Sequence, residues 1–285
     1  MFLYLYIYIY IYIYMKLYII ILCTNKYYSL GVRLGNAITK YYNGTIPIVI
    51  NFFADKNPID DITESNINVN YNYYNTIHKN WYEGANSKFK HILQVINDNE
   101  DENDNYITLM DADTNINKFF NEQIFIHDLF GAEHFDNNTI MINNKPYDRN
   151  EQSKAYIPYN TSLNQVYFQG ALFGGSFSKI KEMCTILIEW QEYNKNILNY
   201  EPIWNDESYL NKYYHYNPPN YIILWKDYPF VVSDKDTIGD QRDFVLIENF
   251  KSISNSSINI NNFLIIGLLI LEIIILCIFY NSRKL

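Results

Sequence analysis

Two short apolar runs, with a helical segment between them, constrain the fold of this chain more than any other feature. Residues 17–24 (LYIIILCT) and 47–54 (PIVINFFA) are continuous apolar stretches, as expected of strands that are buried on both faces. Residues 31–42 have the spacing of a helix. A strand, a helix and a second strand in succession predict an α/β fold, in which helices flank a mostly parallel sheet.

The next segments extend this pattern. Residues 60–75 are rich in Asn and are interpreted as a polar connection, and the acidic run at residues 97–105 (NDNEDENDN) as an exposed loop, because like charges repel one another. Residues 81–97 predict a helix. The side chains of this helix that are available for packing are Trp81, Phe89, Ile92, Val95 and Ile96.

Length and charge limit the function. A chain of 285 residues with 48% hydrophobic residues can form one sizeable domain with a full core. The net charge of −9 argues against a nucleic-acid partner, which would be bound through Lys and Arg. The three cysteines have no paired spacing, so they predict neither a thiolate metal site nor a disulfide framework.

Both ends of the chain carry apolar segments. Residues 263–280 are predicted to form a transmembrane helix, with a buried C-terminal core helix as the alternative. The basic residues that follow would face the cytosol, which places the preceding domain in the lumen of the Golgi or another secretory compartment. Four Asn-x-Ser/Thr sequons, beginning at Asn43, Asn137, Asn160 and Asn255, are compatible with a lumenal glycoprotein.

The N-terminus is an Ile-Tyr alternation over residues 2–14, interpreted as part of a signal or signal-anchor, as a simple repeat, or as a start site placed before Met15. The expected organisation is therefore a single-pass membrane protein with one catalytic domain. Its segments are a low-complexity N-terminus (1–15), the catalytic domain (16–251), a linker (252–262), the transmembrane helix (263–280) and a basic tail (281–285).

A pair of acidic residues follows an apolar run at residues 106–113 (YITLMDAD). The run predicts a central strand that delivers Asp111 and Asp113 at its carboxyl end, where open α/β sheets bind ligands. Residues two apart on an extended segment project to the same side, so the two carboxylates are predicted to share one site. Paired oxygen ligands suit Mg²⁺ or Mn²⁺. A solvated strand end is the alternative interpretation.

A second candidate cluster lies in residues 204–213 (WNDESYLNKY). Trp204 offers a flat apolar face to a sugar ring, and Asp206 and Glu207 could stabilise positive charge at an anomeric carbon or accept hydrogen bonds from hydroxyl groups. The same residues also suit a helix start, with Asn205 or Asp206 as the N-cap. The two interpretations are compatible.

A third cluster lies in residues 167–176 (YFQGALFGGS). Its small residues allow a ligand to approach the backbone closely, although a tight packing corner would have the same composition. Gly174 and Gly175 are predicted to form a turn into a helix that begins near Ser178.

In their order and spacing these segments resemble glycosyltransferase family 6, the group that contains the histo-blood-group A and B transferases and the α-1,3-galactosyltransferases. The resemblance is carried by residues 110–113 (MDAD), 147–158 (YDRNEQSKAYIP), 167–176 and 204–213, and it is closest over residues 81–219. It implies a GT-A-type, Rossmann-like domain. It also implies a retaining hexosyltransferase that moves galactose or N-acetylgalactosamine from a UDP-sugar to a β-galactoside-type glycan of a glycolipid or glycoprotein, in α-1,3 linkage.

The resemblance also implies roles for individual residues on the donor side, with Mn²⁺, or Mg²⁺, bound by Asp111 and Asp113. The donor-binding residues would be Leu22, Thr24 and Tyr27 near the uridine, Lys88 in place of the family's usual arginine, Asp111, Ala112, Asp113, Gln169, Gly170, Ala171, Asn205 in place of the usual histidine, and Asp206. The Gly-Ala pair at residues 170–171 resembles the version that uses galactose.

Glu207 matches the family's catalytic glutamate, either as a nucleophile or as a stabiliser of an oxocarbenium-like state. The acceptor-binding residues would be Trp204, Glu207, His134 and Asp227, although a lone surface histidine is the alternative for His134.

Two other classes of function fit parts of the pattern. A membrane-anchored carbohydrate- or nucleotide-binding protein of the same fold, with weakened transfer, is one, because Lys88 and Asn205 depart from the family pattern. A metal-dependent hydrolase or nucleotidyltransferase is the other, since paired aspartates also suit phosphate substrates. No sequence feature indicates the water-activating base that a hydrolase would need.

Overall fold

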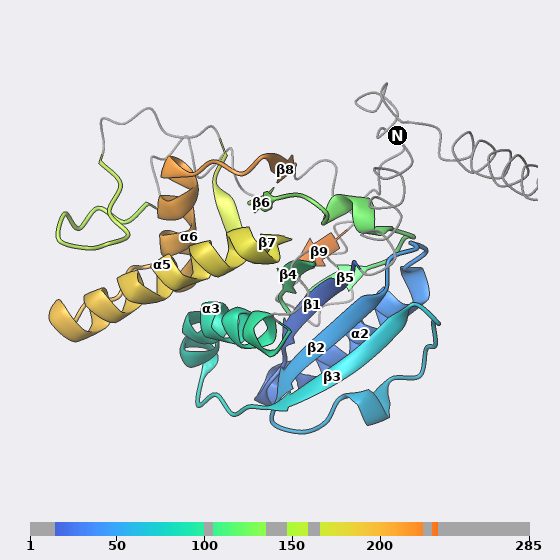
Figure 1. Cartoon of the computed structure of the whole chain (residues 1–285). Coiled ribbons are helices and arrows are strands. Elements are labelled where there is room, and N and C mark those ends of the chain that lie inside the picture. The colour runs from blue at the N-terminus through green and yellow to red at the C-terminus, as the bar shows by residue number, and fades with distance from the viewer. Residues whose placement is uncertain (1–14, 100–104, 135–146, 159–165, 225–229, 233–285) are drawn as a thin grey trace, which may run out of the picture. The chain divides into compact units, whose positions relative to one another are not determined.

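A seven-stranded sheet organises the described part of the chain, which in this computed structural model comprises residues 15–99, 105–134, 147–158, 166–224 and 230–232. The strand order is β3-β2-β1-β4-β7-β6-β8 (Figure 1). The strands are β1 (Leu17–Leu22), β2 (Ile48–Ala54), β3 (Val69–Asn75), β4 (Tyr106–Met110), β6 (Leu129–Glu133), β7 (Phe168–Ser176) and β8 (Tyr221–Ile223), and a separate antiparallel pair is formed by β5 (Thr114–Ile116) and β9 (Phe230–Val232).

The predicted α/β architecture is confirmed. Strands β3, β2, β1 and β4 pair in parallel, as do β6 and β8. Among the strands of this sheet that the structure describes, β7 alone runs in the opposite direction, between β4 and β6. The described residues form the α-helices α2 (Tyr28–Tyr41), α3 (Trp81–Asp98), α5 (Phe177–Ile197) and α6 (Asn205–Tyr216), and the 3-10 helices η1 (Asn25–Tyr27), η2 (Ile59–Asp61) and η3 (Glu122–Ile124).

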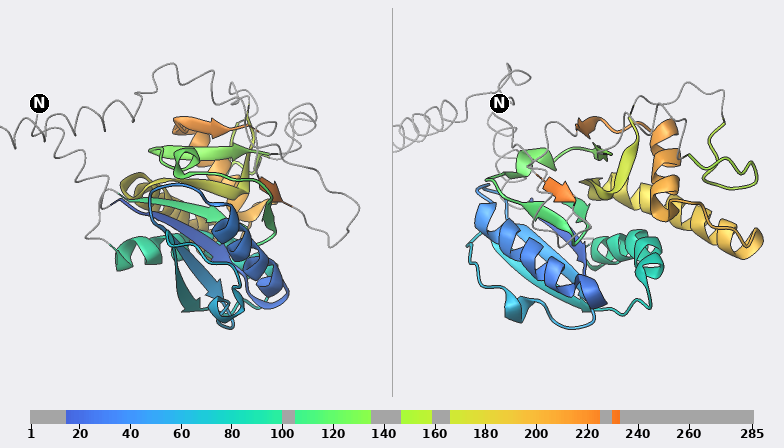
Figure 2. Two further views of the ribbon diagram at one scale, coloured as in Figure 1. Left: turned by 90° about the vertical axis from the view of Figure 1, so that its right-hand side faces the viewer. Right: turned by 180° about the vertical axis from the view of Figure 1, so that it is seen from behind.

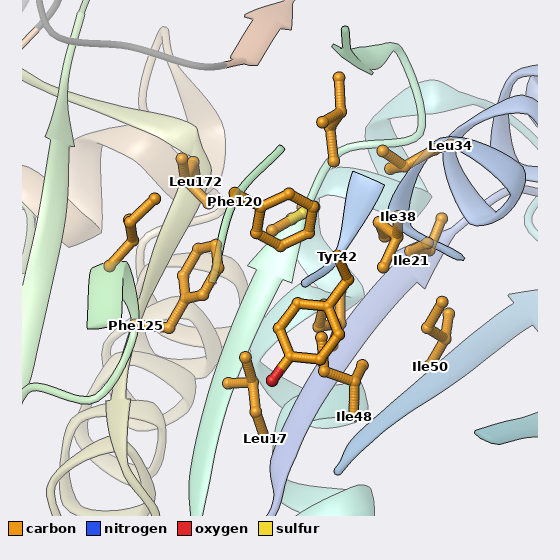
Figure 3. Close-up of a cluster of buried hydrophobic side chains, with 14 of the residues drawn as sticks. Leu17, Ile21, Leu34, Ile38, Tyr42, Ile48, Ile50, Phe120, Phe125 and Leu172 are labelled. Carbon is orange, nitrogen blue, oxygen red and sulfur yellow. The ribbon is translucent and has the colours of Figure 1, made fainter. Parts of the chain in front are cut away.

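Both faces of the sheet are buried, which explains the continuous apolar runs. In β1, Leu17, Ile19 and Ile21 point into one core beneath α2, while Tyr18 and Ile20 point into the other core, formed with α3, α5 and α6. Figure 3 shows the first core, and Figure 2 shows α2 on the side of the sheet opposite α5. A strand between two cores has no side that faces solvent, so most of its side chains are apolar.

Most predicted elements are confirmed. β1, α2, β2, α3 and β4 lie within the predicted segments or begin a few residues from them. Four of the five α3 side chains expected to pack are buried; Trp81, however, is 58% exposed, because it occupies the first position of the helix.

The polar connection predicted for residues 60–75 is wrong over its last part. Val69–Asn75 forms β3, which pairs in parallel with all seven residues of β2. Val69, Tyr71 and Tyr73 alternate with Asn, so one side of this edge strand is covered by the core and the other is more exposed. Asn is unfavourable in strands, and its frequency hid the period of two.

The turn predicted at Gly174 and Gly175 is also wrong. Both lie inside β7, and α5 begins at Phe177. A Cβ at Gly174 would lie 2.3 Å from the Ile107 carbonyl oxygen, and one at Gly175 would lie 2.2 Å from the Asp128 carbonyl oxygen. These glycines therefore permit close approach of neighbouring backbones rather than a change of direction.

Several predictions fall on residues outside the described part. These are the low-complexity residues 1–14, residues 100–104 of the acidic run, and the linker, transmembrane helix and tail at 252–285. None of the helices that the structure describes is long and apolar enough to cross a membrane.

Replacement of Gly174 tests this packing. We expect Gly174→Ala to lower the free energy of unfolding by about 1–3 kcal/mol, because the atom it meets is backbone and cannot rotate away. Gly84→Ala is the matched control. Its Cβ would meet nothing closer than 3.6 Å, so the change should be neutral or stabilising by up to ~1 kcal/mol. Urea denaturation measures both; equal effects would contradict the packing argument.

Candidate active site

Asp111 lies directly after β4, at the carboxyl end of the parallel strands. Its backbone N–H donates to the Ala171 carbonyl at 3.0 Å, and its carbonyl accepts from the Thr114 N–H at 2.9 Å, which closes a turn through Ala112 and Asp113. The predicted strand end is confirmed. The extended geometry predicted for residues 111–113 is wrong, because the chain turns there instead of continuing the strand.

Lys88 of α3 is the centre of the site. Its Nζ lies 2.9 and 3.1 Å from the two carboxylate oxygens of Asp111, 3.0 Å from Oδ2 of Asp206, and 3.0 Å from the carbonyl oxygen of Gly170, to which it donates. An ammonium group has three donors, so all are used. Burial alone would lower the pKa of Lys88, but Asp111 and Asp206 outweigh it and raise the pKa well above its ordinary value, so the residue is charged.

Gly170 of β7 joins this cluster to Glu207. Its N–H donates to Oε2 of Glu207 at 2.8 Å, while its carbonyl accepts from Lys88. A Cβ at this position would lie 2.7 Å from Oδ2 of Asp206. A side chain at this position would therefore displace the Asp206 carboxylate from its contact with Lys88. The close approach of a ligand predicted from the small residues of this segment stays a prediction.

The start of α6 directs two consecutive carboxylates toward β7. The N-cap position is Trp204, which makes no side-chain cap hydrogen bond, so the prediction of Asn205 or Asp206 as N-cap is wrong. Asn205 has a φ of 44°, a left-handed conformation that Asn adopts more readily than most residues. Asp206 and Glu207 then occupy the first turn, where the helix dipole favours negative charge.

The two carboxylates differ in their surroundings. Burial raises the pKa of Glu207 to about 7; the Gly170 N–H and the Tyr167 hydroxyl lower it, while the charge of Asp206 raises it further. Burial also raises the pKa of Asp206, but there the ion pair with Lys88 opposes the rise. Glu207 is thus a carboxyl group that changes charge near neutral pH, a property common at catalytic sites.

The predicted acceptor side is brought near Glu207. Trp204, 51% exposed, precedes the two carboxylates in sequence. His134 is partly buried, with its ring edge-on to Tyr167 at 5.9 Å and its backbone N–H donating to the Tyr167 carbonyl at 2.8 Å, so it is not a lone surface histidine. Asp227 lies outside the described residues.

The residues predicted near the uridine lie at the same edge of the sheet. Leu22 stands two residues beyond the Ile20–Leu109 pair, as Asp111 does on the neighbouring strand. Thr24 and Tyr27 follow at the end of β1 and in η1.

Two more residues predicted to bind the donor, Gln169 and Ala171, lie in β7. Ala171 is buried in β7, and Gln169 is buried with its amide donating to the Glu133 carbonyl at 3.2 Å, on the β6 side. Tyr167, fully buried beside Glu207, lies in the third cluster, but the sequence analysis predicted no role for its hydroxyl, because nothing in its spacing separates it from the many other tyrosines.

The comparison with known families decides the assignment. The model of glycosyltransferase family 6 matches residues 13–237, which is most of the chain. The chain belongs to glycosyltransferase family 6. The family predicted from the sequence motifs is therefore confirmed, and the described residues of the candidate site lie within the matched residues.

Relatives of this family 6 chain come from animals and bacteria. It is 35% identical over 77 residues to histo-blood group ABO system transferase 2 of Rattus norvegicus, covering 27% of the chain and 22% of the relative. It is 31% identical over 93 residues to transferase 1 of that system, covering 33% and 25%, and 32% identical over 77 residues to the Escherichia coli O-antigen biosynthesis glycosyltransferase WbnI, covering 26% and 30%. The matched segments span about a quarter of these relatives.

The buried ion pairs of Lys88 predict that two lysines of α3 contribute very differently to the free energy of unfolding. We expect Lys88→Met to lower the free energy of unfolding by about 3–5 kcal/mol, because it leaves the buried Asp206 carboxylate without its counter-ion. Lys90→Met, which breaks an exposed pair with Glu192, should cost at most about 1 kcal/mol.

Chemical denaturation measures the difference between the two lysine variants. Combining Lys88→Met with Asp206→Asn should restore part of the loss, since the uncompensated charge is removed. Equal losses for Lys88→Met and Lys90→Met would show that the buried cluster does not stabilise the fold.

Proposed function

We propose that this protein is a retaining glycosyltransferase that moves galactose, or alternatively N-acetylgalactosamine, from a UDP-sugar to a β-galactoside-type acceptor in α-1,3 linkage. One observation carries the proposal. Gly170 fixes Glu207 with its N–H and Lys88 with its carbonyl, so a carboxylate with a raised pKa stands beside a charged cluster at the ligand-binding edge of the sheet. The family membership and the names of the relatives support the same chemistry.

Asp111 and Asp113 are the proposed ligands of Mn²⁺, with Mg²⁺ as the alternative. Both are partly exposed at the turn after β4, and two carboxylates suit an ion that keeps open positions for substrate phosphates. The described residues contain no group of three or more His, Cys, Asp or Glu side chains that could hold a metal, so the donor diphosphate would complete the coordination. Both Asp111 oxygens contact Lys88, and we therefore assign direct coordination to Asp113 and a position near the metal and the ribose to Asp111. When bound, the ion neutralises the leaving diphosphate.

The protein residues would do the following in transfer. The bond between the anomeric carbon and UDP breaks, the acceptor oxygen forms a new bond on the same face, and UDP and a proton are released. Glu207 stabilises the positive charge that develops at the anomeric carbon, directly or as a nucleophile. Lys88 holds Asp206 toward β7 through Oδ2, and we assign the other carboxylate oxygen to accept a hydrogen bond from a hydroxyl group of the donor sugar.

Acceptor binding is assigned to the exposed side of the α6 start. Trp204 presents a half-exposed ring beside Glu207, which suits stacking on a sugar. His134 lies next to Tyr167, whose hydroxyl contacts Glu207, and is the second residue proposed to bind the acceptor.

The setting of the enzyme is also a proposal. We infer a single-pass membrane protein whose catalytic domain faces the lumen of a secretory compartment, because residues 263–280 are apolar and are followed by Arg283 and Lys284. Such a setting would supply both the glycan acceptors and the nucleotide sugar. Protease protection of the full chain in sealed microsomes tests the orientation.

Two variants separate binding from transfer. Asp113→Ala should abolish Mn²⁺-dependent UDP binding in isothermal titration. Glu207→Gln should leave UDP binding within about twofold but lower transfer of radiolabelled sugar by at least about 10², the scale of losing one group that stabilises transition-state charge. Unchanged transfer by Glu207→Gln would reject the catalytic assignment, and UDP binding without any transfer by the unaltered protein would favour the binding-protein alternative.

The pKa of Glu207 predicts the acid side of the pH profile. The carboxylate is the active form, and its pKa is about 7, so kcat/KM should fall about tenfold for each pH unit below 7 and level off above it. The profile should be measured at saturating Mn²⁺. In Glu207→Gln the residual rate should lose this acid limb, whereas an unchanged limb would assign it to another group.

A further inference from the structure

A pair of histidines, one buried and one partly buried, lies outside the residues assigned so far. His78, in the connection between β3 and α3, and His91 of α3 have their Nε2 atoms 3.2 Å apart. His78 also contacts two hydroxyl groups: its Nδ1 lies 3.3 Å from Oγ1 of Thr24, and its Nε2 lies 2.9 Å from Oγ of Ser87. The Ser87 hydroxyl in turn donates to the Gly84 carbonyl at 2.8 Å. We call these four residues, Thr24, His78, Ser87 and His91, the histidine cluster.

The hydrogen bonds of the histidine cluster determine which ring nitrogen of His78 carries the proton. Because the Ser87 hydroxyl donates to a carbonyl, its oxygen can only accept from His78 Nε2–H. The proton of His78 is then on Nε2, shared between Ser87 and the Nε2 acceptor of His91, and Nδ1 accepts from the Thr24 hydroxyl. The donors of Thr24, His78 and Ser87 each have an acceptor when both imidazoles are neutral.

The surroundings keep both imidazoles neutral at pH 7. Burial lowers the pKa of His78, which the charge of Glu83 from α3 partly opposes. Burial and the neighbouring His78 lower the pKa of His91 to about 4. From β2, Phe53 lies against the His91 ring at 4.2 Å, and from β3, Tyr74 stacks on Phe53, so these strands add only apolar faces and one phenol.

The histidine cluster joins two parts of the candidate site that no strand connects. Thr24 belongs to the loop after β1, and Asn25 of the same loop donates through its side chain to the His78 carbonyl at 2.6 Å. The N–H of Asn25 donates to Asp55 at the end of β2. On the other side, Ser87 directly precedes Lys88 on α3. The cluster therefore sets the position of the loop after β1 relative to the Lys88 ammonium.

We propose that His78 is a positioning residue for the nucleotide: by fastening the Thr24–Tyr27 loop to α3, it holds the base-binding side of the donor site at a fixed distance from Lys88 and Asp111. This inference rests on the proposed function, which places the nucleotide at this edge of the sheet. His78 acts through Thr24 and Ser87. It does not touch the reacting atoms.

The test compares three replacements of His78 in the full chain. His78→Leu removes all its side-chain hydrogen bonds, and we expect the Kd for UDP in the presence of Mn²⁺ and the KM for UDP-galactose to rise about tenfold, with kcat within about twofold. In His78→Asn the amide can replace Nδ1 and in His78→Gln it can replace Nε2, so each should recover part of the affinity. His215→Leu, at the far end of α6 from Glu207, is the matched control and should change neither constant.

Two measurements do not depend on activity. Long-range nitrogen–proton NMR of the imidazole groups should show His78 protonated on Nε2, and a proton on Nδ1 would overturn the assigned network even if a variant fails to fold. Hydrogen exchange without ligand should be faster at the Tyr27 N–H in His78→Leu, because that group donates to Thr24 within the fastened loop. Unchanged exchange would show that His78 does not fasten the loop.

The outcomes separate the two proposals. If the unaltered protein binds no UDP, the proposed function is wrong and with it the nucleotide role of His78, while exchange still decides whether the loop is fastened. If the unaltered protein binds and transfers but His78→Leu keeps the same Kd and KM, the proposed function stands and the positioning role is rejected.

Discussion

One buried ammonium group determines how the parts of this site fit together. Lys88 contacts Asp111 after β4, the carbonyl of Gly170 in β7 and Asp206 at the start of α6, so a strand end, a second strand and two helices meet at a single nitrogen atom. Two carboxylates brought this close would repel one another, and the burial of Asp206 would leave it without water. The lysine resolves both problems only because all its donors are used; a buried charge with one missing partner costs several kcal/mol.

Much of the frame that holds this cluster could be predicted from the sequence. The apolar runs identify β1, β2 and β4 because each must be apolar on both faces, and the step from apolar to acidic residues places Asp111 at the sheet edge. The central position of Lys88 could not be predicted from the pattern of residue types along the chain. Lys88 and its partners are separated by 23, 82 and more residues, and a lysine on a helix ordinarily indicates a solvated face.

The misses have local causes. β3 was hidden because an edge strand exposes one side, and Asn there resembles a loop. Gly174 and Gly175 were predicted to form a turn but lie inside β7. Glycine is favoured both in turns and where neighbouring strands are crowded, and the sequence alone does not distinguish these two settings. The roles of Tyr167 and His78 were missed for a third reason. Their importance lies in partners from distant segments, and in a chain rich in tyrosine and polar residues neither type stands out.

The difference between Asp206 and Glu207 follows from this arrangement. They are adjacent in sequence and share the first turn of α6, yet Asp206 faces a cation, whereas Glu207 faces the neutral N–H of Gly170 and the hydroxyl of Tyr167. Neutral donors offset burial less than a full charge does, and Glu207 is left with a pKa of about 7. The negative charge of a carboxylate that is held by neutral donors is not neutralised by a cation, so it can stabilise a positive centre that develops nearby. Gly170, by donating to one residue and accepting from the counter-ion of the other, keeps the two carboxylates in separate roles.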